Sequence, residues 1–139
     1  MQDIRLTIIG SQTENGEENT IELITEGLLL KQGDETVIEY DDGAMCGLEK
    51  TKTSLKIQDD CIHMIRTGEI TTEFVFSEAK TYEAMYSTPM GMLQVNVFPT
   101  KVKSKLYDDG GMLDLEYEIK VGDYRAHNRL NIVYEATNS

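Results

Sequence analysis

The chain has 139 residues, of which 40% are hydrophobic and 27% charged, so we expect one globular domain spanning residues 1–139. Its net charge of −12, from 13 basic and 25 acidic residues, argues against binding to nucleic acid or to an anionic membrane, because like charges repel. Two cysteines are too few for a disulfide framework, and the first residues lack the basic and apolar regions of a signal peptide; the expected compartment is the cytoplasm.

Alternation of apolar and polar residues, which is typical of β-strands, begins near the start of the chain. Ile4, Leu6 and Ile8 alternate with polar residues. The polar residues 12–19 are predicted to form a loop. Residues 19–31 fit either a helix or a strand, and we interpret them as a strand because no capping box precedes them.

The same alternation continues to the end of the chain. Its clearest instance is residues 112–121, where one face is apolar or aromatic and the other charged, as in a half-buried antiparallel strand. Residues 77–86 fit a helix or a strand, and we favour a strand. The polar residues 124–129 are predicted to form a loop before the last strand. The remaining predicted strands are residues 35–40, 51–57, 61–67, 71–76, 80–88, 93–97, 101–107 and 130–135.

Short turns rich in Gly and Asp, such as Gly33-Asp34 and Gly122-Asp123, separate these strands. Both residue types tolerate the left-handed backbone conformations that hairpins need. Many short strands at this spacing predict an all-β fold, a small closed antiparallel barrel of about eight to ten strands.

Four short motifs resemble those of the YwiB-like family, a group of uncharacterised small bacterial proteins. They lie at residues 47–53, 66–68, 86–91 and 111–117. The resemblance covers most of the chain and implies a calycin-like, lipocalin-like barrel. It implies no assigned activity and no catalytic residues.

The motifs that mark catalytic, cofactor and metal sites are missing from the sequence. The potential soft metal ligands are Cys46, Cys61 and His63. The two cysteines lack the short spacing of a structural zinc site. No Gly-x-Ser-x-Gly elbow or phosphate-binding glycine loop is present. We therefore predict no metal, no cofactor and no catalytic residue, and an enzyme is the less favoured reading.

Polar and amphipathic side chains on faces that we expect to point inward are the candidate ligand-binding residues. An inward Arg66 must be paired, because an isolated buried charge is costly; an inward acid or the carboxylate or phosphate of a ligand would serve. Alternatively, the tyrosines are core residues with satisfied hydroxyls and the barrel is full. The set comprises Thr51, Thr53, Arg66, Tyr82, Tyr86, Thr88, Tyr117 and Tyr134.

Two functional hypotheses follow from these observations. The first is a non-catalytic binding protein that holds a small amphipathic or anionic molecule in the lumen, oriented by Arg66 and the tyrosines. The second is a filled barrel that acts as an acidic protein-interaction or self-associating module, and a homodimer is compatible with it. Fold alone does not decide between them.

Overall fold

The computed structural model describes residues 2–41, 52–58, 61–67, 72–77, 80–88, 91–107 and 109–137. All regular structure in these ranges is β-strand, which confirms the all-β prediction, including the described parts of residues 19–31 and 77–86. Among them, no helix is long and apolar enough to cross a membrane. The strands are β1 (Gln2–Glu14), β2 (Glu17–Gln32), β3 (Glu35–Asp41), β4 (Lys52–Gln58), β5 (Cys61–Thr67), β6 (Thr72–Ser77), β7 (Tyr82–Thr88), β8 (Gly91–Leu106), β9 (Gly110–Val121) and β10 (Tyr124–Ala136).

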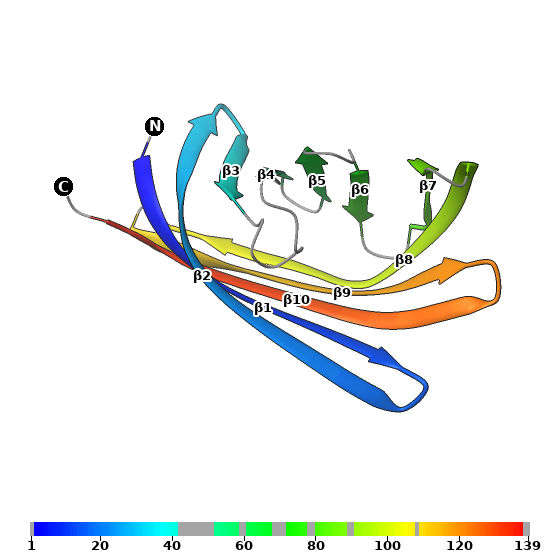
Figure 1. Cartoon of the computed structure of the whole chain (residues 1–139). Helices are drawn as coiled ribbons and strands as arrows, with labels where there is room; N and C mark the ends of the chain where they lie inside the picture. The colour runs from blue at the N-terminus through cyan, green and yellow to red at the C-terminus, as the bar shows by residue number, and fades with distance from the viewer. Residues whose placement is uncertain are drawn as a thin grey trace.

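The ten strands form one antiparallel sheet that curls into a nearly closed barrel. Their order is β6-β5-β4-β3-β2-β1-β10-β9-β8-β7. Sequence neighbours therefore pair as hairpins except β6 and β7, which are the two end strands, and β1 joins β10. Between the two end strands, β6 and β7, the amide of Lys80, which precedes β7, donates to the carbonyl of Ser77 at the end of β6 at 3.1 Å. Figure 1 shows the long hairpins β1–β2 and β9–β10 extending past the short strands β3 to β6.

Alternation along each strand decides which side chains face the barrel interior, as predicted. Ile4, Leu6 and Ile8 of β1 are buried, and Leu113 and Leu115 of β9 are fully buried. The charged face of β9 differs from the prediction at one position. Asp114 points outward and yet is buried, because long basic side chains from the neighbouring strands cover it.

One long strand replaces two predicted ones. The segments 93–97 and 101–107 both belong to β8, and the pairing register with β9 shifts between Pro99 and Lys101. Such a bulge inserts one residue and bends the strand without ending it. Val97 before the bulge and Val102 after it therefore both face inward despite their opposite parity.

Two predicted loops are wrong, because strands run through them. Residues 12–19 form the end of β1, a tight turn and the start of β2; the turn residues Asn15 and Gly16 have φ values of 52° and 81°. Two left-handed residues in succession make the hairpin turn whose twist matches its strands. Residues 124–129 likewise belong to β10, which pairs with β9 from Tyr124 onward.

Candidate ligand-binding site

Apolar side chains fill the middle of the barrel. They come from strands on every side and form one continuous cluster, so the central part is a packed core. This arrangement agrees with the filled-barrel alternative for the middle of the molecule. The fully buried members include Phe76, Ile4, Leu6, Ile8, Ile38, Leu55, Ile62, Met64, Leu113, Leu115, Ile132 and Val97.

A cavity of about 210 Å³ lies where the two long hairpins leave this core. The strand register explains why its lining residues meet: Gly10 of β1 stands between Ile21 of β2 and Leu130 of β10. One step further out, Gln12 stands between Asn19 and Asn128. These positions share the inward parity of Ile8, and a glycine at one of them leaves room for the cavity. The lining residues are Gly10, Ser11, Gln12, Asn19, Ile21, Arg66, Tyr117, Asn128, Arg129 and Leu130.

Arg66 and Tyr117 reach the cavity from opposite sides of the barrel. Arg66 lies near the end of β5, and its Nε donates to Oγ1 of the fully buried Thr53 at 3.4 Å. The ring of Tyr117 packs against Phe76 with centroids 4.7 Å apart. Burial raises the pKa of Tyr117, and the guanidinium of Arg66 opposes that rise. Tyr117 is therefore a neutral hydroxyl at neutral pH, next to a permanent cation.

The lining of the cavity is cationic in an acidic protein. Its uncompensated cation is Arg66, and none of the ten lining residues that the structure describes is acidic, although the chain has 25 acidic residues. Arg129 also borders the cavity, but its strand position faces outward. Arg129 is held by Asp114, whose Oδ1 accepts from its Nε at 3.5 Å, while Lys101 Nζ lies 2.8 Å from Oδ2. These hydrogen bonds outweigh burial and keep the pKa of Asp114 below its ordinary value.

A chain of side-chain hydrogen bonds fixes the outer end of the cavity. Gln12 Nε2 donates to Tyr124 Oη at 2.6 Å, and Tyr124 Oη donates to Glu14 Oε2 at 3.1 Å. These bonds tie the β1–β2 hairpin to β10. Burial and the Glu14 carboxylate raise the pKa of Tyr124, so the link is intact at neutral pH.

The structure divides the residues predicted as ligand-binding into three groups. Arg66 and Tyr117 line the cavity, and Thr53 hydrogen-bonds to Arg66. Tyr82 is half-buried against the core, and Tyr134 is buried but is not among the lining residues. Thr51 and the side chains of Tyr86 and Thr88 lie outside the described part of the structure.

Sequence reasoning missed the polar lining that the long hairpins supply, namely Gln12, Asn19 and Asn128. The first two fell inside the predicted loop 12–19 and the third inside the predicted loop 124–129. The signal that would have found them is Asn15-Gly16, because this pair predicts a two-residue hairpin turn and extends both strands to it.

Other candidate chemistry gains no support. No cluster of three or more potential metal ligands occurs among the described residues. Cys61 is a free thiol, and His63 pairs through Nε2 with Glu73 Oε1; Cys46 lies outside the described residues. A second cavity of about 240 Å³, at the far ends of β4 and β8, is lined by Asp34, Thr36, Ile57, Gln58, Ser104 and Leu106.

Comparison with known proteins agrees with the resemblance that the sequence motifs indicate. The model of a family described as a domain of unknown function (DUF1934) matches residues 6–132. The "Uncharacterized beta-barrel protein YwiB" of Bacillus subtilis (strain 168) is 24% identical over 123 residues, which cover 88% of this chain and 85% of that protein. The crystal structure of the ywiB protein from Bacillus subtilis superposes with a TM-score of 0.86 at 21% identity, covering 99% of this chain and 93% of the other. The structural likeness establishes the barrel fold.

Proposed function

The chain belongs to the DUF1934 family, whose description leaves its function open, and we propose that this member is a non-catalytic binding protein that holds a small anionic molecule in the cavity beside Arg66. The observation that carries the proposal is the cationic lining of that cavity. In a chain with a net charge of −12, a cavity with Arg66 and no acid among its described lining residues favours an anion over a cation. Arg129 adds little to this preference, because Asp114 balances its charge.

Arg66 suits the polar end of such a ligand. A guanidinium has five N–H donors in a planar fork, so it can hold Thr53 and a carboxylate or phosphate oxygen at the same time. The neutral hydroxyl of Tyr117 and the amide of Asn128 add further hydrogen-bonding groups to the lining. Hydrogen bonds to charged groups are the strong ones, each worth about 1.5–3 kcal/mol.

Two apolar residues of the lining suit a short apolar segment of the ligand. Ile21 and Leu130 both line the cavity, and Ile21 is 50% exposed although its strand position faces inward. The volume of about 210 Å³ is below the range of roughly 300–1,000 Å³ that is usual for drug-sized ligands. We therefore expect a small amphipathic anion with a short apolar tail.

Isothermal titration calorimetry with two matched series of ligands tests the proposal. The first series is straight-chain carboxylates from acetate to octanoate, and the second is the straight-chain amines of equal length. We expect the carboxylates to bind with affinity that rises with chain length until the cavity is full, and the amines to bind at least about tenfold more weakly. Equal binding of both series, or heat from neither, would refute it.

An Arg66→Met variant separates binding from folding. Methionine keeps much of the apolar stem, so we expect carboxylate affinity to fall about 10- to 100-fold. The free energy of unfolding should fall by only about 1 kcal/mol, for the lost hydrogen bond to Thr53. The matched control is Arg125→Met, which removes an exposed arginine that does not line the cavity and should bind like the wild type. A variant Arg66→Met that binds carboxylates as tightly as the wild type would count against the proposed site.

A further inference from the structure

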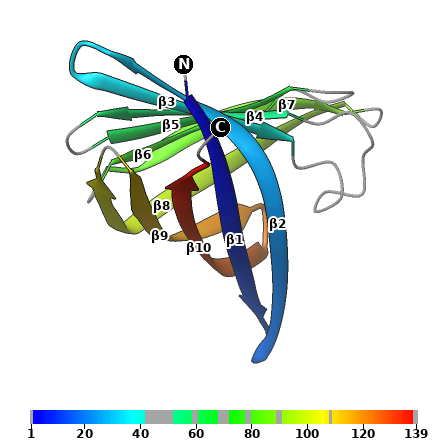
Figure 2. The same ribbon diagram turned by 90° about the vertical axis from the view of Figure 1, so that its left-hand side faces the viewer.

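The second half of β8 forms an unpaired edge of the sheet. β7 pairs with β8 only from Gly91 to Val97, whereas β9 pairs with it from Asn96 to Leu106. Among the described strands, the half of β8 after Val97 therefore has a neighbour on one side alone. Every second residue of such a strand turns its backbone N–H and C=O away from that neighbour. Figure 1 shows how far β8 extends past the short β7, and Figure 2 shows β8, β9 and β10 in succession.

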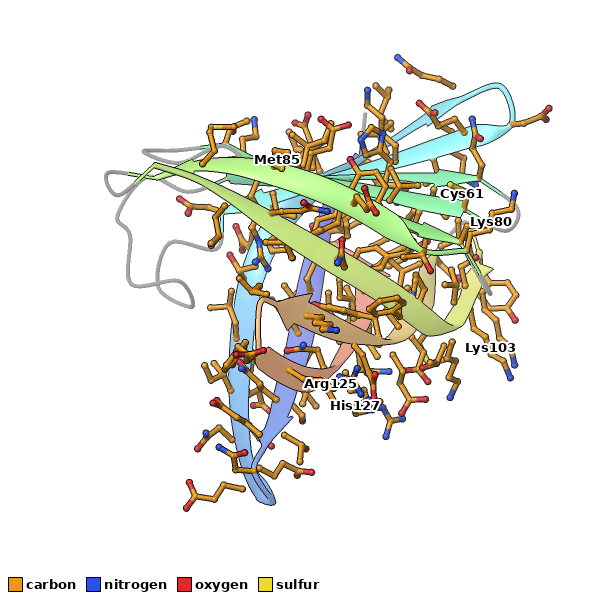
Figure 3. The ribbon with its side chains drawn as sticks, turned by 90° about the vertical axis from the view of Figure 1, so that its right-hand side faces the viewer. Cys61, Lys80, Met85, Lys103, Arg125 and His127 are labelled. Carbon is orange, nitrogen blue, oxygen red and sulfur yellow. The ribbon has the colours of Figure 1, made fainter. Side chains whose placement is uncertain are left out.

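A row of lysines follows this edge on the outer face of the barrel. Lys101, Lys103 and Lys105 pair with outward-facing residues of β9, so their own side chains point outward. Lys101 Nζ is held by Asp114 Oδ2 at 2.8 Å, while Lys103 and Lys105 are exposed. Figure 3 shows Lys103 on the outside of the barrel, far from Met85 of β7. Two residues along a strand span about 6.7 Å, so these lysines repeat at the interval of alternate side chains in any neighbouring strand.

The cavity of about 240 Å³ lies on the inner side of the same edge. Ser104 and Leu106, whose positions alternate with those of the lysines, line it from β8, and Ile57 lines it from β4. A cavity of about 150 Å³ can hold benzene, so this one can hold an aliphatic side chain. In a strand added to the edge, alternate side chains would point toward this cavity and the others would lie beside the lysines.

We propose that the edge of β8 from Lys101 to Leu106 binds an extended acidic segment of a partner protein, which adds to the sheet as a further strand. The backbone of the segment pairs with the N–H and C=O groups of the edge, and its alternate carboxylates lie beside Lys103 and Lys105. Main-chain hydrogen bonds provide the affinity in this mode of recognition, and opposite charges on neighbouring strands stabilise the pairing. An uncharged side chain between two acids, such as valine, enters the cavity.

The lysine row distinguishes this partner from two others. A second copy of the chain that paired through the same edge would bring lysines next to lysines, and edge lysines of this kind prevent self-pairing. A nucleic acid carries negative charge, but it has no peptide groups to extend the sheet, and the net charge of −12 repels a long polyanion. A short acidic segment responds mainly to the adjacent lysines, because salt screens charges that lie beyond about 8 Å.

Fluorescence anisotropy with a labelled peptide of sequence Glu-Val-Glu-Val-Glu-Val tests the proposal. We expect a dissociation constant below about 500 µM at low salt. Lys103→Glu combined with Lys105→Glu should weaken binding at least about fivefold and should bind Lys-Val-Lys-Val-Lys-Val instead. The matched control, Lys56→Glu combined with Lys120→Glu, changes the net charge equally at exposed lysines of strands that are paired on both sides, and should bind like the wild type. Arg66→Met should also bind like the wild type, which separates this edge from the proposed anion cavity.

A backbone-methylated form of the acidic peptide tests the strand pairing itself. Methylation of its peptide nitrogens keeps every charge but removes the N–H donors that an added strand needs, so this form should not bind. The proposal is overturned if the methylated form binds equally well, if the acidic peptide fails to bind up to about 1 mM, or if both double variants weaken binding equally. Tighter binding of an oligothymidylate of equal charge would assign the lysines to a nucleic acid. A wild-type dimer that Lys103→Glu with Lys105→Glu abolishes would assign the edge to a second copy, and either result also overturns the proposal.

Discussion

Replacing Tyr134 by phenylalanine should make the protein more stable. The side chain is 3% exposed, its ring lies against Gly111, and its hydroxyl has no hydrogen-bond partner among the described residues. Burial also raises the pKa of this hydroxyl, as expected for a polar group removed from water. A buried hydroxyl that has lost its water without gaining a partner destabilises the folded state by about 1–3 kcal/mol.

The expected gain follows from two opposing terms. Removing the hydroxyl abolishes the desolvation cost, and it leaves a void of roughly 10 Å³ that costs about 0.2 kcal/mol at about 24 cal/mol per Å³. The free energy of unfolding of Tyr134→Phe should therefore exceed that of the wild type by about 1 kcal/mol. For a domain of this size that difference raises the melting temperature by about 3 °C.

Urea unfolding followed by circular dichroism measures the difference, and the carboxylate titration provides a second readout. Tyr134 is not among the residues that line the cavity, so Tyr134→Phe should bind carboxylates like the wild type. Tyr117→Phe is the matched control, since it removes the hydroxyl of a lining residue and should weaken binding several-fold. A loss of stability of 1 kcal/mol or more in Tyr134→Phe would mean that its hydroxyl makes a stabilising hydrogen bond, and would refute the reasoning.

Two further predictions concern the frame of the barrel. Gly27→Ala should lower the free energy of unfolding by at least about 2 kcal/mol in urea, because a Cβ there would collide with the backbone oxygen of Glu39; unchanged stability would show that the strands can separate at no cost. Asp114→Asn should lose about 2 kcal/mol at pH 7, where it leaves Lys101 and Arg129 without their carboxylate. Because the folded-state pKa of Asp114 lies below its ordinary value of 3.8, its contribution is present above that pH and lost as the pH falls further. The wild type should accordingly lose more stability than Asp114→Asn between pH 5 and pH 2, and parallel acid titrations of the two would contradict this.

Sequence reasoning was reliable where a single strand carries its own signal. The alternation of Leu113 and Leu115 with charged residues predicts a half-buried strand without reference to any other segment, and the structure has that strand. It was less reliable where strand ends and pairing matter. Residues 124–129 are polar, yet they extend β10, because β9 pairs with them along its whole length.

The candidate site was only half predictable for a related reason. Arg66 and Thr53 could be chosen because each is a polar residue at an inward position of its own strand. Their neighbours in the cavity depend on register: Asn128 meets Tyr117 because β10 and β9 pair at those residues, and no local pattern fixes that pairing. Composition was misleading here, since short polar stretches also form loops.

Ile21 offers the sharpest distinction between a ligand cavity and a barrel that is merely full. Its strand partner Gly10 faces inward, so Ile21 faces inward too, and yet half of the side chain is exposed. In a filled barrel without a ligand, half of the Ile21 side chain stays in contact with water, and exposed apolar surface contributes nothing to stability. A bound molecule with an apolar tail would cover it. The long strands β1, β2, β9 and β10 supply nine of the ten lining residues, including Ile21 and the amides, and Arg66 of β5 supplies the tenth. The extra length of these strands therefore supports the binding proposal more directly than the barrel fold does.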